Sequence, residues 1–291
     1  MRCRSALTRI DAMRTGELPA QESTAVHQHL KTCRSCDESV TDLSALTSTI
    51  KELVVPSPRS LKSTCTDHFD VIDADGEQVV VAFSDRGLRM IKIGASVDEL
   101  RAQYCERFDR DLTESALPER LRKQVIAALS GEGVDKPVVD FTDVGDFERK
   151  VLEILTRIPR GEVRTYTWVA RQAGNPKAVR AVGNICARNV VPFVVPCHRV
   201  VPASGGVGQY AFGASAKRAL LQREGVPIEE LDDLARRGVR YVGSKTTNIY
   251  CFPTCKDARR IREGNFVPFH DEREAAKKGF RPCKRCQPAA A

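Results

Sequence analysis

The stretch Asn189-Val-Val-Pro-Phe-Val-Val-Pro-Cys-His-Arg-Val-Val201 is the most informative part of this 291-residue sequence. Its apolar, β-branched residues predict a buried strand that carries Cys197 into the interior, next to the imidazole of His198. A buried thiol ordinarily has a raised pKa and is inert, so a reactive Cys197 needs a group that accepts its proton. His198 is the candidate base, and a buried carboxylate would orient and polarise its ring. The candidate carboxylate is Glu224, near the end of a helix predicted over residues 215–225.

A helix-turn-helix is predicted just upstream. Residues 147–158 have helical periodicity, Thr165 caps a short helix over 166–173, and Asn175-Pro176 opens a second helix that runs to Arg188. The second helix pairs small residues with arginines, as close approach to a nucleic-acid groove requires. Generic helical hairpins share these features, so the pattern alone leaves both interpretations open.

The preceding segment predicts a small α/β scaffold. Residues 79–83 and 88–93 are apolar, β-branched strands joined by the turn Ser84-Asp-Arg-Gly87. Ser96 begins a capping box, and Pro118 stands at the first turn of another helix. This segment contains no obvious catalytic set, so its role is expected to be structural.

These parts together resemble the O6-alkylguanine-DNA alkyltransferases. The resemblance covers about residues 65–226 and is dense over 146–226. It rests on Arg180-Ala-Val-Gly183, Asn189, Pro196-Cys-His-Arg-Val200, Gly208-Gln-Tyr-Ala-Phe-Gly213 and Lys217.

The resemblance implies a role for each matching residue. Cys197 would accept an alkyl group irreversibly from O6 of guanine, Arg180 would enter the base stack in place of the flipped nucleotide, and Tyr166 would assist rotation and protonation. Asn189 would support the thiol loop, and Tyr210 would line the pocket and hydrogen-bond the extruded base. A methylated guanine pairs poorly, so its extrusion costs less than that of a normal base. No diffusible cofactor is needed, because the protein is the acceptor.

The candidate residues of this site fall into three groups. The catalytic group is Cys197, His198, Glu224, Tyr166 and Asn189, the DNA-binding group is Ala178, Arg180, Ala181 and Gly183, and the pocket group is Tyr210, Phe212 and Pro192. The sequence departs from many family members at Val190, where they have proline, and at Phe212, where they have glycine. The bulk of Phe212 predicts a narrow pocket that takes methyl rather than large alkyl groups, although family members joined to Ada-type domains also carry an aromatic residue there.

Two close thiol pairs mark the last segment. Cys251-x3-Cys255 and Cys283-x2-Cys286 lie in a stretch too short for a large core, and four thiolates at this spacing predict a Zn²⁺ site. A purely structural zinc ribbon is the alternative. Residues 241–251 and 279–288 resemble the methylphosphotriester-accepting zinc domain of Ada, although Asn248 replaces the usual glycine.

This second resemblance implies that Cys251 is both a zinc ligand and a methyl acceptor, and that Thr247 and Arg285 contact the DNA backbone. Zinc holds sulfurs as thiolates at neutral pH, and a centre with four of them carries a formal −2 charge. Such a centre repels phosphodiesters but not a neutral methyl triester. Methylation of Cys251 is therefore expected to lower the negative charge by one and to strengthen DNA binding.

The first segment contains a third ligand pattern, His29-x3-Cys33-x2-Cys36, and Cys3 would complete a tetrahedral Zn²⁺ site. The alternative is a helical hairpin with packed cysteines and a solvated His29. His27 is a less suitable ligand, because only His29 is one helical turn from Cys33. The pattern, with the stretch Thr15-Gly-Glu-Leu-Pro-Ala-Gln-Glu22, resembles the zinc-containing anti-sigma-factor fold, which implies a sigma-factor partner.

Charge and cysteine content are also uneven along the chain. Of the net charge of +8, residues 1–56 contribute zero, 57–145 contribute −5, 146–238 contribute +6 and 239–291 contribute +7. DNA is therefore expected to contact the second half. No run approaches the ~18 apolar residues of a membrane span, and the N-terminus lacks a signal-peptide core. The sequence predicts a cytoplasmic protein in which eleven cysteines serve metal binding or thiolate chemistry.

The predicted fold class is a multidomain α/β protein. Its expected domains are a helical zinc domain (1–56), a ribonuclease H-like α/β lobe (57–145), a helix-turn-helix alkyltransferase lobe (146–235) and a four-cysteine zinc domain (239–288). The predicted activity is single-turnover DNA repair by methyl transfer to a protein cysteine. The alternative is a methylation- or redox-responsive transcription regulator that acts through a sigma factor or promoter DNA and uses the central domain as a lesion sensor. The expected partner is double-stranded DNA with an alkylated guanine, without a membrane partner, and the protein is expected to be a monomer.

Overall fold

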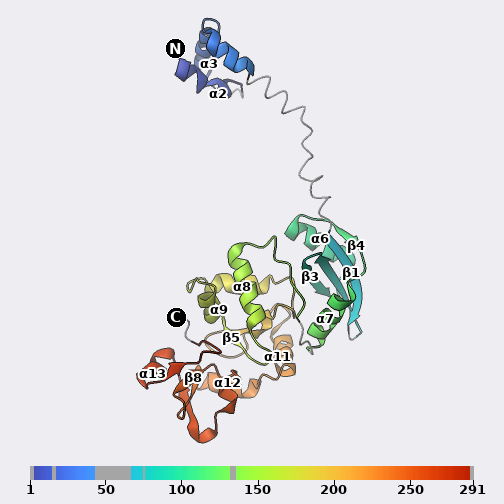
Figure 1. Ribbon diagram of the computed structural model, residues 1–291, viewed down its shortest axis with the longest axis vertical. Helices are drawn as coiled ribbons and strands as arrows, with labels where there is room; N and C mark the ends of the chain where they lie inside the picture. The colour runs from blue at the N-terminus through green and yellow to red at the C-terminus, as the bar shows by residue number, and fades with distance from the viewer. Residues whose placement is uncertain (1–2, 15–17, 43–66, 75, 132–135, 289–291) are drawn as a thin grey trace. The chain divides into compact units, whose positions relative to one another are not determined.

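A computed structural model describes residues 3–14, 18–42, 67–74, 76–131 and 136–288. The chain divides into two compact units, residues 1–61 and 62–291, and each is considered by itself. Both helices and sheets are present (Figure 1), as predicted. Within the described residues, no helix is long and apolar enough to cross a membrane. Cys65, one of the eleven cysteines, lies outside the described residues, as does the predicted domain boundary at residues 56–57.

The described residues of the first unit, 3–14 and 18–42, form helices and turns. Ala6, Ile10, Val26 and Cys36 are buried and form its small interior, in which α1 packs against α3. The interior holds few large apolar side chains, so a metal would add stability that the core cannot supply. The elements are α1 (Cys3–Leu7), α2 (Ile10–Arg14), α3 (Ala20–Leu30) and a helical segment over 34–42.

The second unit begins with a four-stranded sheet in the order β3-β2-β1-β4. The predicted hairpin at Ser84–Gly87 is confirmed, because β2 and β3 pair in antiparallel register across it. The capping box of Ser96 with Glu99 is also confirmed. Pro118 lies one position earlier than expected, as the N-cap of its helix. The elements are β1 (Asp67–Ala74), β2 (Glu77–Ser84), β3 (Gly87–Ile93), α6 (Val97–Phe108), β4 (Leu112–Glu114) and α7 (Glu119–Ser130).

A helical lobe follows the sheet. Thr165 caps the first helix of the predicted helix-turn-helix, as expected, since its hydroxyl accepts from the Trp168 amide. The second helix begins at Val179, not at Pro176, because Asn175–Ala178 close a turn through the Ala178 amide and the Asn175 carbonyl (3.0 Å). The elements are α8 (Asp146–Arg157), β5 (Arg164–Thr165), α9 (Tyr166–Gln172), α10 (Val179–Ala187), β6 (Val200–Val201), α11 (Ala214–Arg223) and α12 (Ile228–Arg236).

The segment before Cys197 is not the strand that its apolar residues predict. Residues 190–195 form bends and turns, and Cys197–Arg199 form one 3-10 turn that leads into β6. The two prolines of the segment lack the N–H groups that a strand ladder needs. Phe193 adopts a left-handed backbone with φ of 69°, which also breaks an extended path. The thiol is therefore presented by a rigid loop, and the short strand comes after it.

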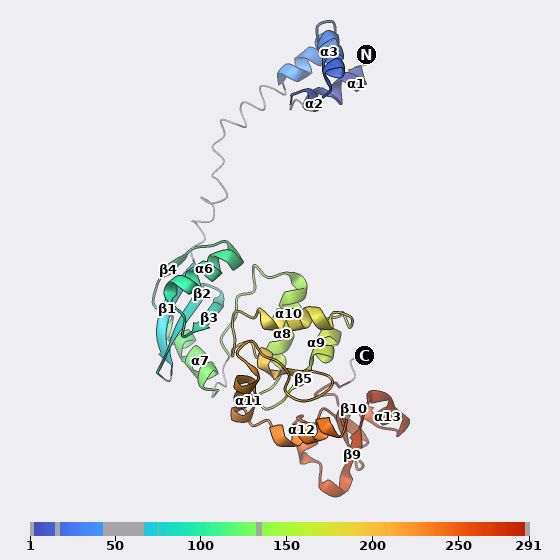
Figure 2. The ribbon, with the colours of Figure 1, turned by 180° about the vertical axis from the view of Figure 1, so that it is seen from behind.

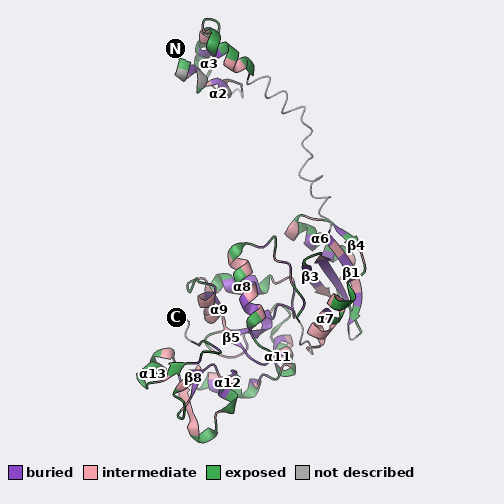
Figure 3. Cartoon of the chain, viewed as in Figure 1, coloured by how far each residue is buried: buried purple, intermediate pink, exposed green. Residues whose placement is uncertain are grey.

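Sheet and helical lobe share one hydrophobic core. Ile72, Val81 and Ile91 from the sheet belong to the same buried cluster as Leu155 of α8 and Cys197. The Ile91 amide also donates to the Val190 carbonyl (2.8 Å), which ties β3 to the thiol loop. Figure 2 shows α8, α9 and α10 gathered beside this sheet, and Figure 3 shows buried residues along the strands and on α8. The sheet of the acidic segment, residues 57–145, thus supports the loop that carries the Cys197 thiol.

A second four-stranded sheet, in the order β10-β8-β7-β9, forms the last part of the chain. Its own buried cluster includes Val242, Phe252 and all four cysteines of the last segment. The elements are β7 (Tyr241–Ser244), β8 (Ile249–Cys251), β9 (Phe266–Phe269), α13 (Glu272–Lys277) and β10 (Arg281–Pro282), with 3-10 turns at Ala258–Arg260 and Glu263–Asn265.

Candidate active site and metal centres

Asn189 organises the loop around the buried thiol of Cys197. Its amide nitrogen Nδ2 donates to Cys197 Sγ (3.2 Å) and to the Val195 carbonyl (2.8 Å), and its Oδ1 accepts from the Val191 amide (3.1 Å). Cys197 is only 4% exposed, and burial raises the pKa of its thiol. The Asn189 hydrogen bond and then the charge of Lys217 act in the opposite direction on that pKa. The Asn189 side chain thus supplies the loop with hydrogen bonds that a strand would obtain from a neighbouring strand. It also favours the thiolate of Cys197.

A histidine, a carboxylate and an arginine form a buried network beside the thiol. His198 Nε2 donates to Glu224 Oε1 (2.9 Å), since the carboxylate can only accept. Arg199 donates to both oxygens of Glu224, from Nε (2.8 Å) and from a terminal nitrogen (2.7 Å). Burial lowers the pKa of His198 from its ordinary value, although Glu224 opposes this, so burial favours the neutral ring. His198 Nδ1 is buried and has no hydrogen-bond partner in the described residues, which leaves this nitrogen able to accept a proton.

Lys217 is a fully buried cation near the thiol. Its Nζ donates to the carbonyls of Val200 (2.6 Å) and Gln209 (3.3 Å), which join the thiol loop to the loop that carries Tyr210. Burial lowers the pKa of Lys217 to about 8, against the raising effects of Cys197 and Cys186. A lysine in this setting holds two loops together and favours negative charge on sulfur.

A cavity of about 260 Å³ opens onto Cys197. Tyr166 from α9 and Tyr210 lie in its wall with the predicted groove residue Gly183, and hydrogen bonding by the Tyr210 hydroxyl acts against burial to lower the pKa of the Cys197 thiol. Cys186 also lines this cavity. Burial raises the pKa of Cys186 to about 12, so its thiol stays protonated. The remaining lining residues are Ala187, Gln209 and Ala211.

Other predicted residues of this site lie outside the cavity wall. Phe212 is 54% exposed and packs on Tyr210 with ring centroids 5.4 Å apart, and Pro192 is buried in the thiol loop. Arg180 and Ala181 are exposed on α10, and Ala178 is its N-cap. Arg199 and Lys217 lie in the motifs that carry the family resemblance, but the sequence predicted no role for either. Their structural roles depend on hydrogen bonds to Glu224 and to the Val200 carbonyl, which lie far from them along the chain.

The four cysteines of the last segment converge in space. The sulfurs of Cys251, Cys255, Cys283 and Cys286 lie within 4.8 Å of one another, and all four residues are buried. Such a set of soft ligands fits Zn²⁺. A cavity of about 480 Å³ is lined by Cys251 and Cys283 with the exposed Thr247, whereas Arg285 is exposed elsewhere. Asn248 has a left-handed φ of 51°, which accounts for glycine as the usual residue there.

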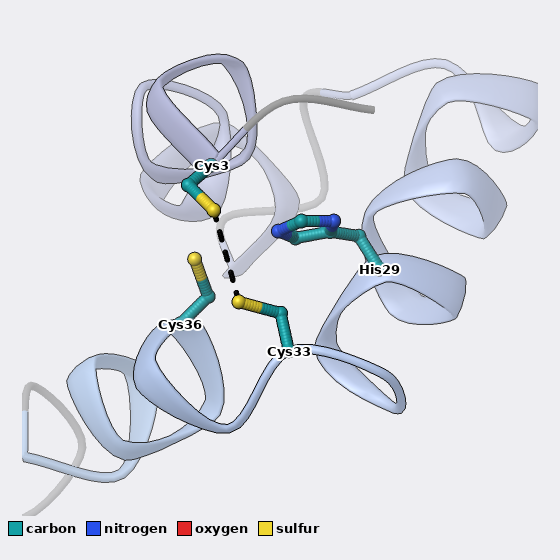
Figure 4. A group of neighbouring side chains, drawn as sticks. All are labelled: Cys3, His29, Cys33 and Cys36. Carbon is teal, nitrogen blue, oxygen red and sulfur yellow. Dashed lines mark hydrogen bonds between the residues drawn. The ribbon is translucent and has the colours of Figure 1, made fainter.

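The N-terminal cluster has the ligand set that its spacing predicts. Figure 4 shows Cys3 of α1, His29 of α3, Cys33 and Cys36 pointing toward one another. Their ligand atoms lie within 4.8 Å, and His29 Nε2 is buried without a hydrogen-bond partner in the described residues. An imidazole nitrogen in this state fits a metal ligand better than the predicted alternative of a solvated histidine. The cluster can therefore hold a metal ion.

Comparison with known proteins matches both lobes. The DNA binding domain of 6-O-methylguanine DNA methyltransferase matches residues 146–226, and the metal binding domain of Ada matches residues 231–289. A methylated-DNA–protein-cysteine methyltransferase of Methanosarcina barkeri is 31% identical over 54% of this chain and 96% of that protein. The bifunctional transcriptional activator/DNA repair enzyme Ada of Escherichia coli is 34% identical over 54% of this chain and 45% of that protein. The crystal structure of a Mycobacterium tuberculosis O6-methylguanine methyltransferase is 30% identical over 54% of this chain and 92% of that one, with a TM-score of 0.43.

The lobe around Cys197 is thus a DNA binding domain of the methyltransferase class, and the last lobe is a metal binding domain of the Ada type. The chain belongs to the family of methylated-DNA–protein-cysteine methyltransferases, as the match over nearly the whole archaeal protein shows. The chain spans about half the length of other curated relatives, 53% for a methyltransferase of Methanothermobacter thermautotrophicus and 42% for the regulatory protein ada of Salmonella typhimurium.

Proposed function

We propose that the protein repairs DNA by moving a methyl group from O6 of guanine to Cys197 Sγ. A bond from sulfur to methyl forms as the O6–methyl bond breaks, and the leaving group becomes guanine once it is protonated. His198, polarised by Glu224, takes the thiol proton directly or through one water. Tyr166, which lines the same cavity, supplies a proton to the base. The observation that carries this proposal is a buried thiol that lines a cavity and is followed in the chain by a histidine hydrogen-bonded to a buried carboxylate.

The DNA approach follows from the position of α10. Gly183 in this helix lines the cavity, while Arg180 and Ala181 are exposed on it. A helix that presents small residues and an arginine can enter a groove closely, and Arg180 can fill the gap that an extruded base leaves. The partner is double-stranded DNA with an alkylated guanine.

Peptide mass spectrometry tests this function. The protein is incubated with a duplex that carries one O6-methylguanine and no modified phosphate, then digested and mapped. The expected product is one added methyl group on the peptide with Cys197 and restored guanine in the DNA. Unmodified Cys197 with unchanged lesion would refute the assignment.

The last lobe supports a second acceptor function. Cys251 lies in the wall of a cavity together with Thr247 and Arg260, so a DNA backbone can approach its sulfur. The acceptor would be Cys251 and the donor a methylphosphotriester, which carries no charge to oppose the thiolates. Thr247 and Arg285 would hold the neighbouring phosphates.

Methylation of Cys251 is expected to strengthen binding to unmodified duplex by about tenfold at low salt, because the centre loses one negative charge that repels phosphates. Binding is compared by fluorescence anisotropy before and after reaction with a methylphosphotriester oligonucleotide. A Cys251→Ser protein treated in the same way is the control and should show no change. Equal affinities before and after methylation of the wild type would contradict the charge argument.

The purified protein is expected to contain two Zn²⁺ per chain, one in each cluster. Cys33→Ser and Cys286→Ser should each lose one equivalent, because three ligands hold the ion less tightly than four. Metal content is measured by mass spectrometry after gel filtration. Cys105→Ser, which removes an exposed thiol outside both clusters, should retain two. A content that Cys33→Ser leaves unchanged would contradict the N-terminal centre.

The proposed domains are residues 1–56, 57–145, 146–235 and 239–288. The first has an anti-sigma-like fold and the second a ribonuclease H-like fold. The protein is proposed to be a monomer. The metal cluster supports a zinc module at the neutral N-terminal segment, for which we propose a regulatory role. Its partner would be a sigma factor. Copurification of a sigma factor that is lost in Cys33→Ser tests this assignment separately from repair.

A further inference from the structure

The segment from Thr254 to Arg259, around the second zinc-centre cysteine, is docked on the lobe that holds Cys197. The hydroxyl of Thr254, which is buried, accepts from the Val163 amide (2.9 Å) and lies 3.4 Å from the Val163 carbonyl. The Lys256 amide donates to Glu162 Oε1 (3.1 Å), and Arg259 donates to the Gly161 carbonyl. Residues 161–163 are therefore held by backbone and side-chain groups of the zinc domain.

The contact buries a charged pair that belongs to the other lobe. Glu162 and Arg164 are both about 3% exposed and form an ion pair at 2.5 Å. The Arg164 guanidinium lies against the rings of Trp168 and of Phe252, which comes from the zinc domain, at 5.5 and 5.2 Å. A buried pair of this kind is costly when one side is left unsatisfied, so the two surfaces are built for permanent contact.

The docked segment leads directly to the active site. Arg164 and Thr165 form β5, which pairs in parallel with Val200 and Val201 of β6. β6 follows the Cys197–Arg199 turn without interruption, and β5 is followed at once by Tyr166, which lines the Cys197 cavity. Two groups of the proposed reaction are thus attached to the strand pair that the zinc domain holds.

Trp168 lies at the centre of the same contact. Its ring packs against the core of the Cys197 lobe and against the core of the zinc domain, and its Nε1 donates to the Gln287 carbonyl (2.9 Å). Nearby, Arg171 pairs with Glu272 (2.7 Å). Because the chain has one tryptophan, its fluorescence reports on this contact alone.

We propose that the zinc domain is a positioning element of the Cys197 site: Thr254, through Val163 and β5, sets Tyr166 and the thiol loop for methyl transfer. This inference rests on the proposed function at Cys197. It makes the two acceptor domains one working unit, in which Thr254 and Glu162 are positioning residues that touch neither the DNA lesion nor the reacting sulfur.

Thr254→Val tests the proposal, because valine keeps the shape and removes the hydroxyl that satisfies the Val163 amide. The first-order rate of methyl transfer at saturating O6-methylguanine duplex is expected to fall about tenfold. The duplex concentration for half-saturation should stay unchanged, since DNA contacts are not altered. Trp168 emission should shift to the red and become more open to acrylamide quenching. Thr254→Ser should restore the rate and the emission.

Thr113→Val, an exposed substitution of the same type in β4, is the matched control and should behave as wild type. Zinc content of each variant is measured alongside the rate. If Thr254→Val loses zinc, Glu162→Gln is the deciding variant for the inference, because it weakens the same contact from the other lobe. It should then give the same loss of transfer rate and the same shift in Trp168 emission. Wild-type transfer rates in both variants would overturn the inference, whereas absence of transfer in the wild type would instead refute the function itself.

Discussion

A Cys197→Ser protein is expected to transfer no methyl group from O6-methylguanine, while it still binds the modified duplex. The serine hydroxyl is far less acidic than a thiol, and a neutral His198 cannot ionise it to the extent that an attack on a methyl group requires. The substitution is nearly isosteric, so the hydrogen bond from Asn189 and the cavity remain. Transfer is measured as loss of label from a duplex with a tritiated methyl group.

Cys105→Ser is the matched control for this experiment, because it removes an exposed thiol of α6. It should react at the wild-type rate. Cys186 lies in the same cavity as Cys197, so label on Cys186 in the Cys197→Ser protein would contradict the assignment of Cys197 as the only acceptor in that cavity.

Glu224→Gln is expected to slow transfer by about 10²- to 10⁴-fold, the range that a lost general base produces. Glutamine cannot carry the charge that polarises His198, and its amide group would oppose the donors of Arg199. The rate is measured at saturating duplex. Glu106→Gln, at an exposed position of α6, is the control and should leave the rate unchanged. Wild-type transfer by Glu224→Gln would exclude the histidine–carboxylate pair from the mechanism.

The same carboxylate should make stability depend on pH in a defined window. Hydrogen bonds from His198 and Arg199 lower the pKa of Glu224 from 4.5 to about 2, although burial alone would raise it. A lowered carboxyl pKa adds stability above pH 4.5 that is lost as the pH falls through 2, and this shift corresponds to about 3 kcal/mol. The free energy of unfolding in urea is compared for wild type and Glu224→Gln. Their difference should shrink between pH 4.5 and 2, and a constant difference would contradict the assigned pKa.

Ligand sets and caps could be predicted from short spacings in the sequence. His29, Cys33 and Cys36 lie within two helical turns, so helical local structure brings them together, which an extended strand would not. Thr165 and Ser96 were predicted as caps for the same reason, since a cap satisfies amides only three residues away. The hairpin at residues 84–87 likewise depends on local turn chemistry.

The form of the thiol loop could not be predicted from local pattern. Apolar, β-branched residues before Cys197 favour a strand. Instead, the Asn189 side-chain amide donates to the Val195 carbonyl and accepts from the Val191 amide, which stabilises a turn. Burial of those side chains against the core of the sheet and α8 is compatible with either path, so hydrophobicity alone did not distinguish them.

The sequence by itself predicted which thiol stands next to a histidine, which cysteines can share a metal, and which helix is proposed to meet DNA. Only the tertiary structure decided that Arg199 holds Glu224, that Cys186 faces the reactive cavity, and that Thr254 reaches Val163. The physical reason is range. Ligand spacing is set within one or two turns, whereas these hydrogen bonds and cavity walls join residues that only the folded chain brings together.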